Sequence, residues 1–147
     1  MIVTFCGHRQ YCREKGDEAK VLAFLEEKIG DNIADIYLGG YGNFDHFAYA
    51  CSKKYKQTHS NVSLLFITPY LREELLKEEM QFYDGIIYPE IEDKPLRFAI
   101  SYRNKWMVEK ADYVIAYITH SFGGAYSTYK HAKKCGKSIF NLAELEQ

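Results

Sequence analysis

Three short turns in the sequence combine glycine with polar residues, and each follows an apolar run and precedes a stretch with helical spacing. The runs and their turns are residues 2–6 with Gly7-His8-Arg9, residues 34–38 with residues 39–45, and residues 113–118 with residues 119–125. Glycine lets the backbone come close to an anion, and the first N–H groups of a helix have no partner within that helix. The three turns therefore predict a site for a phosphate- or nucleotide-sized ligand.

Side chains in and near these turns could supply further contacts. Arg9 and Arg103 carry planar guanidinium groups that match phosphate oxygens, and Arg103 shares a helical side with Ala99 and Met107. An arginine on such a side either extends beside the core or faces a polar cavity, and we predict the second role. The predicted ligand- and phosphate-binding residues are Gly7, His8, Arg9, Gly40, Gly42, Asn43, Phe44, Arg103, Ser121, Gly123 and Gly124.

Two carboxylates are candidates for catalysis. Asp45 lies in the first turn of a predicted helix, where the helix dipole favours its ionised form. It could accept a hydrogen bond from a ribose hydroxyl, or it could only cap the helix. Glu90 follows Pro89 in a segment rich in Ile and Tyr, where desolvation would suit it to proton transfer. The sequence has no metal-ligand spacing and no standard dinucleotide fingerprint, so we expect neither a metal nor a cofactor.

The elements that must position these residues alternate between strand and helix. Apolar runs predict strands over residues 2–6, 34–38, 62–67, 113–118 and 138–142, with residues 83–92 as a short strand or extended loop. Helical spacing predicts helices over residues 17–30, 43–55, 71–80 and 95–110 and after residue 123. This order is typical of an α/β protein, and we predict a Rossmann-like three-layer sandwich with a mostly parallel sheet of about five strands. No repeat or linker divides the sequence, so residues 1–147 are expected to form a single domain.

Composition narrows the function classes. The chain of 147 residues has 19 Lys and Arg against 20 Asp and Glu, so a basic surface for duplex nucleic acid is not implied. Four cysteines show neither CxxC pairs nor zinc-like spacing. No apolar run reaches membrane-spanning length, and the first residues form a predicted strand rather than a leader. We therefore expect a reduced, cytoplasmic protein that does not enter a membrane.

Taken together, these segments resemble the SLOG superfamily. That superfamily contains the LOG phosphoribohydrolases, the Smf/DprA DNA-processing proteins and the small YpsA-like proteins. The resemblance spans nearly the whole chain and is closest to the YpsA-like branch, whose first strand and TGHR-type turn resemble residues 4–9 and whose second glycine turn resembles residues 40–45. Residues 103–107, 111–116 and 123–125 resemble the LOG segment RKxxM, its following strand and PGGxGTxxE. The resemblance implies a SLOG-like Rossmannoid fold and a nucleotide-like ligand, and it favours a homodimer.

Two departures from the LOG pattern bear on catalysis. Phe122 stands where LOG enzymes have a proline before the paired glycines. The glutamate of their TxxE segment aligns near Tyr129 or Lys130, and neither residue supplies a carboxylate. The resemblance therefore does not imply LOG-type hydrolysis.

Three functions compete at this point. The first is binding or sensing of a nucleotide or nucleotide-derived small molecule without catalysis. The second is an N-glycosidase, phosphoribohydrolase-like or deoxyribosyltransferase-like enzyme that uses Asp45 or Glu90. The third is binding of single-stranded nucleic acid through Tyr and Arg side chains, and the near-neutral charge counts against it. We therefore expect a nucleotide-like small molecule as the partner and do not expect nucleic acid.

Overall fold

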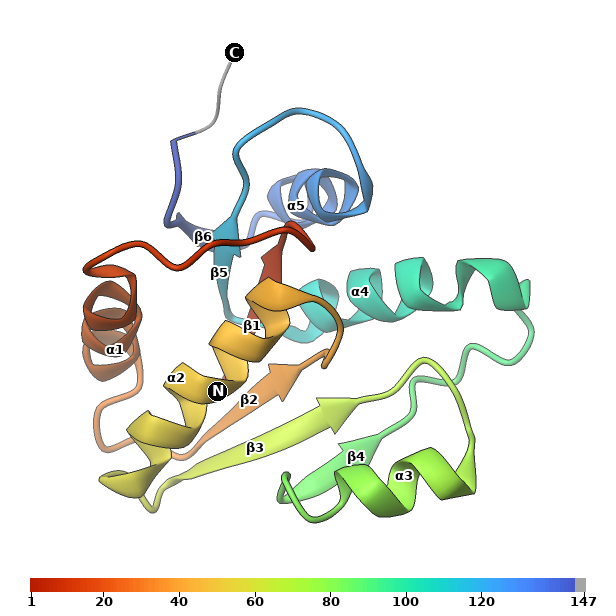
Figure 1. Cartoon of the computed structure of the whole chain (residues 1–147), viewed down its shortest axis with the longest axis horizontal. Coiled ribbons are helices and arrows are strands. Elements are labelled where there is room, and N and C mark those ends of the chain that lie inside the picture. Colours follow the sequence, from red (N-terminus) through yellow and green to blue (C-terminus); the bar gives the residue numbers. More distant parts are fainter. Residues whose placement is uncertain (145–147) are drawn as a thin grey trace.

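A single sheet is the scaffold of the molecule, and its six strands are all parallel (Figure 1). The computed structural model describes residues 1–144. In chain order the strands are β1 (Ile2–Gly7), β2 (Ala34–Leu38), β3 (Val62–Ile67), β4 (Gly85–Ile87), β5 (Tyr113–Tyr117) and β6 (Ser138–Asn141). Their order across the sheet is β4-β3-β2-β1-β5-β6. The strand order therefore reverses between β1 and β5, where open α/β sheets leave a crevice at their carboxyl edge.

Helices cover both faces of this sheet. The helices α1 (Asp17–Lys28) and α2 (Asn43–Gln57) pack on one face, and α4 (Ala99–Lys110) and α5 (Gly124–Lys134) pack on the other. The short helix α3 (Glu73–Glu79) lies near the edge strand β4 and has no buried residue. No helix within residues 1–144 is both long and apolar enough to span a membrane. The architecture confirms the predicted Rossmann-like three-layer fold.

Alternation along the strands explains why the sheet can be covered on both sides. Val3 and Phe5 of β1 pack with Leu25 of α1 in one core cluster. Cys6 faces the other way and packs with Val108 of α4 in a second cluster. Strands buried on both faces carry apolar residues at successive positions, and each fully buried aliphatic or aromatic side chain contributes about 1.5–3 kcal/mol.

The structure decides one alternative that the sequence left open, and it differs from the prediction at the start of one helix. The uncertain segment 83–92 supplies a sixth strand, because Gly85–Ile87 pairs with the end of β3. The strand has only three residues, all half-buried, which is why the sequence could not separate a short strand from an extended loop. The helix predicted from residue 95 begins instead as a 3₁₀ turn over Leu96–Phe98, in which the Phe98 N–H donates to the Pro95 carbonyl (2.9 Å).

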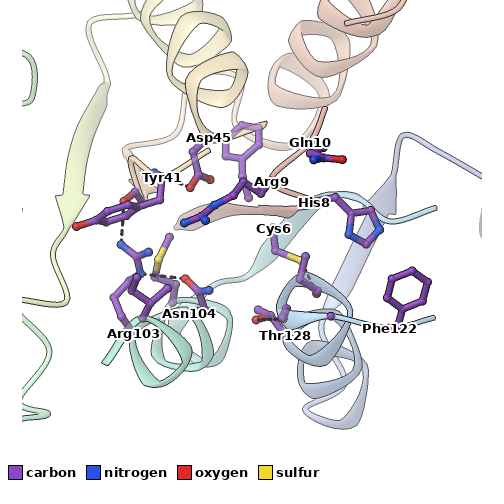
Figure 2. Close-up of a pocket in the computed structure, with 18 of the residues that line it drawn as sticks. Cys6, His8, Arg9, Gln10, Tyr41, Asp45, Arg103, Asn104, Phe122 and Thr128 are labelled. Atoms are coloured by element: carbon purple, nitrogen blue, oxygen red, sulfur yellow. Dashed lines mark hydrogen bonds between the residues drawn. The ribbon is translucent and has the colours of Figure 1, made fainter. Parts of the chain in front are cut away.

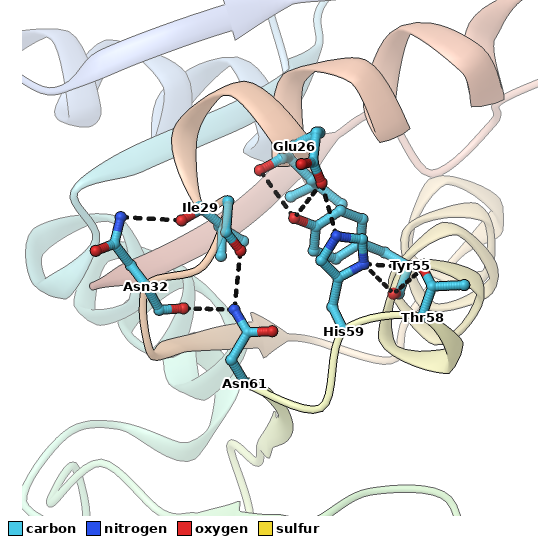
Figure 3. Close-up of polar contacts among 9 residues, drawn as sticks. Glu26, Ile29, Asn32, Tyr55, Thr58, His59 and Asn61 are labelled. Carbon is cyan, nitrogen blue, oxygen red and sulfur yellow. Dashed lines mark hydrogen bonds and ion pairs between the residues drawn. The ribbon is translucent and has the colours of Figure 1, made fainter.

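A network of side chains closes the amino-terminal edge of the sheet, where α1 and α2 end (Figure 3). The rings of His59 and Tyr55 are stacked with centroids 3.8 Å apart, and His59 Nε2 lies 2.6 Å from Glu26 Oε2. The Tyr55 hydroxyl donates to the same oxygen of Glu26 (3.1 Å). Asn61 Nδ2 donates to the carbonyl oxygen of Gly30 (2.9 Å) in the turn after α1. The amino-terminal edge therefore holds its polar side chains in contact with one another.

Candidate functional site

A pocket of about 670 Å³ lies at the carboxyl edge, where the strand order reverses (Figure 2). The three glycine turns and α4 all contribute to its lining. From the turns, the lining residues are Gly7, His8, Arg9, Gly39, Tyr41, Asp45, His120, Phe122, Gly123, Gly124 and Ala125. Figure 2 shows Tyr41 and Arg103 on one side of the pocket and His8 and Phe122 on the other. The parallel sheet thus brings together turns that lie more than a hundred residues apart in the sequence.

Five predicted ligand-binding residues do not line this pocket. They are Gly40, Gly42, Asn43, Phe44 and Ser121. Gly40 and Gly42 have φ angles of +73° and +87°, a conformation in which a side chain is strained. A Cβ atom at Gly40 would also lie 2.7 Å from the Phe66 ring. These two glycines therefore shape the turn, and Phe44, which is fully buried, belongs to the core.

The glycines that do line the pocket differ in their surroundings. A Cβ atom at Gly7 would lie only 2.3 Å from the ring of Phe44, so Gly7 allows close packing of β1 against α2. Cβ atoms at Gly123 and Gly124 would meet nothing within 4 Å. The third turn, immediately before α5, is therefore the one whose backbone is open to a ligand.

Arg103 has a structural role that the sequence did not reveal. Its side chain is only 1% exposed, and Nη1 donates to the carbonyl oxygens of Gly39 (2.8 Å) and Ile67 (2.6 Å), just after β2 and at the end of β3. Nε donates to Asn104 Oδ1 (2.9 Å), and the guanidinium lies 5.4 Å from the ring centroid of Tyr41. Burial lowers the arginine pKa, and Asp45 opposes that shift. Arg103 lines the pocket, but these bonds make it a link between α4 and the two strand ends.

Asp45 also departs from its predicted state. The sequence favoured an ionised carboxylate at the start of a helix, but burial raises the pKa of Asp45 above its ordinary value. The Tyr41 N–H, which donates to Asp45 Oδ2 (2.8 Å), and the Arg103 guanidinium both oppose this shift. Asp45 therefore organises the turn before α2 by bonding to its backbone.

The nearby Cys6 thiol is also buried, and burial raises its pKa to about 12, so it is not a nucleophile at neutral pH.

The other side of the pocket is formed by three rings in a row, of which the first two are stacked and the third is tilted. His8 and His120 are parallel, with centroids 3.7 Å apart and planes inclined by 7°. The Phe122 ring follows at 3.9 Å from His120, with planes inclined by 30°. His8 Nε2 accepts the Thr119 N–H (3.0 Å), so this nitrogen carries no proton. Burial, and to a lesser extent His120, lowers the pKa of His8 and keeps it neutral.

Arg9 is the predicted residue whose charge is most open to a ligand. Its side chain is exposed, and the backbone beside it is held in place because the Asn43 N–H donates to the Arg9 carbonyl (3.0 Å). Its neighbours in the pocket include Gln10 and Tyr41, which are also exposed. The site predicted from the sequence did not include Tyr41 or Phe122, although each lies within one of the glycine turns.

Glu90 does not belong to this site. It is exposed and does not line the pocket, so the desolvation on which its predicted catalytic role depends is missing. Without Glu90, Asp45 is the pocket's only carboxylate among the lining residues, and its oxygen already accepts a backbone N–H. The described residues also hold no group of three or more His, Cys, Asp or Glu side chains arranged to bind a metal.

Comparison with solved structures identifies known proteins that share this architecture. The chain shares the fold of DNA processing protein A. The protein from Streptococcus pneumoniae superposes with a TM-score of 0.66 at 15% identity, over 97% of this chain and 50% of that one. The Helicobacter pylori protein, whose structure describes a unique single-stranded DNA binding mode, gives 0.62 at 19% identity, over 98% and 66%. The chain thus spans half to two thirds of these proteins. No protein-family model and no curated protein matches the sequence.

These neighbours are 15% and 19% identical to this chain and show a shared fold, so the SLOG superfamily and its YpsA-like branch stay predictions. They also correct two expectations. The leading hypothesis from the sequence was a binder of a nucleotide-derived small molecule, and nucleic acid was not expected as a partner. A neighbour described by its single-stranded DNA binding contradicts that ranking and favours the third hypothesis. The error came from the net charge, which describes the whole surface and not the lining of one pocket.

Proposed function

We propose that this protein binds single-stranded nucleic acid in the carboxyl-edge pocket. The observation that carries the proposal is the combination of an exposed arginine, Arg9, with a column of stacked rings that ends in the exposed Phe122. Proteins that bind single strands combine cationic groups for the backbone with aromatic faces for the bases. The fold shared with the Helicobacter pylori protein supports the same assignment.

The charge of the pocket is compatible with this function even though the whole chain has a formal charge of −1. Arg9 and Arg103 line the pocket together with Asp45, whose burial disfavours the ionised carboxylate. The local balance is therefore positive. Phosphate contacts depend on such local groups, because salt screens charges that lie more than about 10 Å away.

The proposed contacts follow from the exposure of each group. Arg9 binds a backbone phosphate, and the backbone N–H groups at Gly123 and Gly124 bind a second one. His8 and Arg103 hold the walls of the site in place.

We further propose that the chain is a single SLOG domain of the YpsA-like branch, for which the Gly7-His8-Arg9 turn is the support. A homodimer, inferred from LOG-like relatives, can be tested by light scattering.

The test of nucleic-acid binding is fluorescence anisotropy with a labelled oligothymidylate, long enough to cover a site of about 4–16 nucleotides. We expect saturable binding at about 0.15 M salt that weakens as salt increases. Arg9→Ala should reduce the affinity about tenfold, the loss of one charge-assisted bond, and should lower the salt slope by about 0.7. Arg13→Ala is the matched control, because Arg13 lies in the same loop but pairs with Glu18 and does not line the pocket.

Two outcomes would contradict the proposal. In the first, oligothymidylate fails to bind to the wild-type protein under conditions in which thymidine monophosphate binds. The other is an equal loss of affinity in the Arg9→Ala and Arg13→Ala proteins, which would indicate charge attraction over the whole surface rather than a site.

A further inference from the structure

The column of rings in the pocket is anchored at one end and free at the other. Its inner member, His8, is 7% exposed, and two backbone contacts fix it: the His8 N–H donates to the Tyr117 carbonyl (3.2 Å), and Nε2 accepts the Thr119 N–H (3.0 Å). His120 is fixed in turn, because its Nδ1 lies 3.0 Å from Thr119 Oγ1. The outer member, Phe122, is 69% exposed.

Folding gains little from the ring of Phe122, because most of it is exposed. A phenylalanine ring is among the most apolar side chains, and burying it in the core contributes about 1.5–3 kcal/mol that this ring mostly does not gain. Its contact with His120 aligns the ring without covering it. The ring thus presents an aromatic surface beside the pocket mouth, at the end of a stack with centroid spacings of 3.7 and 3.9 Å.

We infer that Phe122 is a base-stacking subsite and that one unpaired nucleobase continues the column His8–His120–Phe122. The inference rests on the proposed function and assigns one contact within it. A nucleobase is flat and aromatic, so it can extend a stack at the spacing already present between the rings.

The surroundings of Phe122 favour a nucleotide over a protein side chain. Gly123 and Gly124 follow directly, and Cβ atoms there would meet nothing, so the phosphate that is joined to a stacked base has space beside the ring. The first N–H groups of α5, which have no acceptor within the helix, begin at the same place. Arg9 lines the same pocket as a second phosphate contact. A ring for the base and donors for its phosphates therefore lie within one continuous site.

The test separates the base from the backbone. Binding of an oligothymidylate is compared with binding of an abasic oligonucleotide of equal length, which keeps the phosphates and lacks the bases. We expect Phe122→Ala to weaken oligothymidylate binding about five- to 150-fold, the effect of losing one base–aromatic stack, and to leave abasic binding unchanged. Phe122→Tyr should retain wild-type affinity. Phe82→Ala is the matched control, because Phe82 is 52% exposed and does not line the pocket.

A second variant reports the contact directly. In Phe122→Trp, oligothymidylate should quench the fluorescence of the added indole beyond any change in the wild-type protein, which contains Trp106 alone. The abasic strand should not produce this additional quenching.

The outcomes distinguish this inference from the proposed function. If the wild-type protein binds neither oligonucleotide, the proposed function fails and the stacking subsite fails with it. If the wild-type protein binds oligothymidylate and Phe122→Ala binds it equally well, only the stacking subsite is wrong. Equal losses for the thymidylate and abasic strands in a Phe122→Ala protein with a wild-type melting temperature would also overturn the inference, because the ring would then act on the backbone site.

Discussion

The two edges of the sheet both contain a histidine stacked on a second ring, but they use it differently. At the amino-terminal edge, His59 is stacked on Tyr55 and its Nε2 meets the Glu26 carboxylate at 2.6 Å. At the carboxyl edge, His8 is stacked on His120, and within residues 1–144 no ion pair includes either of them. One stack ends in a pairing between side chains of the protein. The other ends in an exposed ring.

The same contrast holds for the backbone. At the amino-terminal edge, Asn61 covers the carbonyl oxygens of Gly30 and Asn32, which closes the turn after α1. At the carboxyl edge, Gly123 and Gly124 face open space. The difference teaches that exposure at the carboxyl edge is local. Elsewhere on that edge Arg103 bonds to the ends of two strands, and Gly7 lets β1 pack closely against Phe44.

The largest expected effect is at Arg103, and it would show that the carboxyl edge is built on structural bonds. Arg103→Ala removes the donor to two buried carbonyl oxygens and leaves a cavity, so we expect the free energy of unfolding to fall by about 2–5 kcal/mol. Arg103→Lys keeps the charge but not the planar group, so its free energy of unfolding should lie between those of the wild type and Arg103→Ala. Urea unfolding measures both. Wild-type stability with impaired oligonucleotide binding in the alanine variant would return Arg103 to the ligand-binding role that the sequence suggested.

A smaller effect should separate the two kinds of glycine. In Gly7→Ala, the added methyl group meets the buried Phe44 ring, and overpacking of this kind costs about 1–3 kcal/mol. In Gly124→Ala it meets open space, and the change in stability should stay within about 0.5 kcal/mol. Thermal unfolding of the two variants provides the comparison. Equal destabilisation would mean that the third turn is as closely packed as the first.

The smallest effect concerns pH and contrasts the two histidines. Because burial lowers the pKa of His8 below its ordinary value of 6.5, the unfolded chain takes up this proton before the folded protein does. The free energy of unfolding should therefore fall as the pH drops below about 6.5, and His8→Gln should remove that part of the loss. His59→Gln, at the opposite edge, should leave it in place. A His8→Gln protein with the acid sensitivity of the wild type would show that His8 does not carry the effect.

The sequence predicted the fold better than it predicted the site. Apolar runs and glycine turns are local signals, so the α/β order and the junctions at residues 7–9, 39–45 and 119–125 could be recognised. The roles of side chains depend on partners that are distant in the sequence. Arg103 bonds to carbonyl oxygens 64 and 36 residues away, and His8 Nε2 accepts an N–H 111 residues away.

Asp45 and Glu90 show the same limit. Helix position alone indicated an ionised Asp45, but tertiary burial outweighs the helix dipole there and raises its pKa. The composition around Glu90 suggested an apolar environment, but the side chain of Glu90 is exposed to solvent. In both cases local sequence indicated the wrong surroundings, because packing decides which groups lose water.

The position of β1 within the sheet sets the order in which the molecule can be completed during synthesis. β1 is synthesised before the other five strands of the sheet, and it pairs with β2 on one side and with β5 on the other, Val3 opposite Tyr113 and Gly7 opposite Tyr117. Until β5 has left the ribosome, one side of β1 has no partner and the wall that carries Phe122 does not exist. The β4-β3-β2-β1 part of the sheet can therefore be synthesised before the pocket is complete.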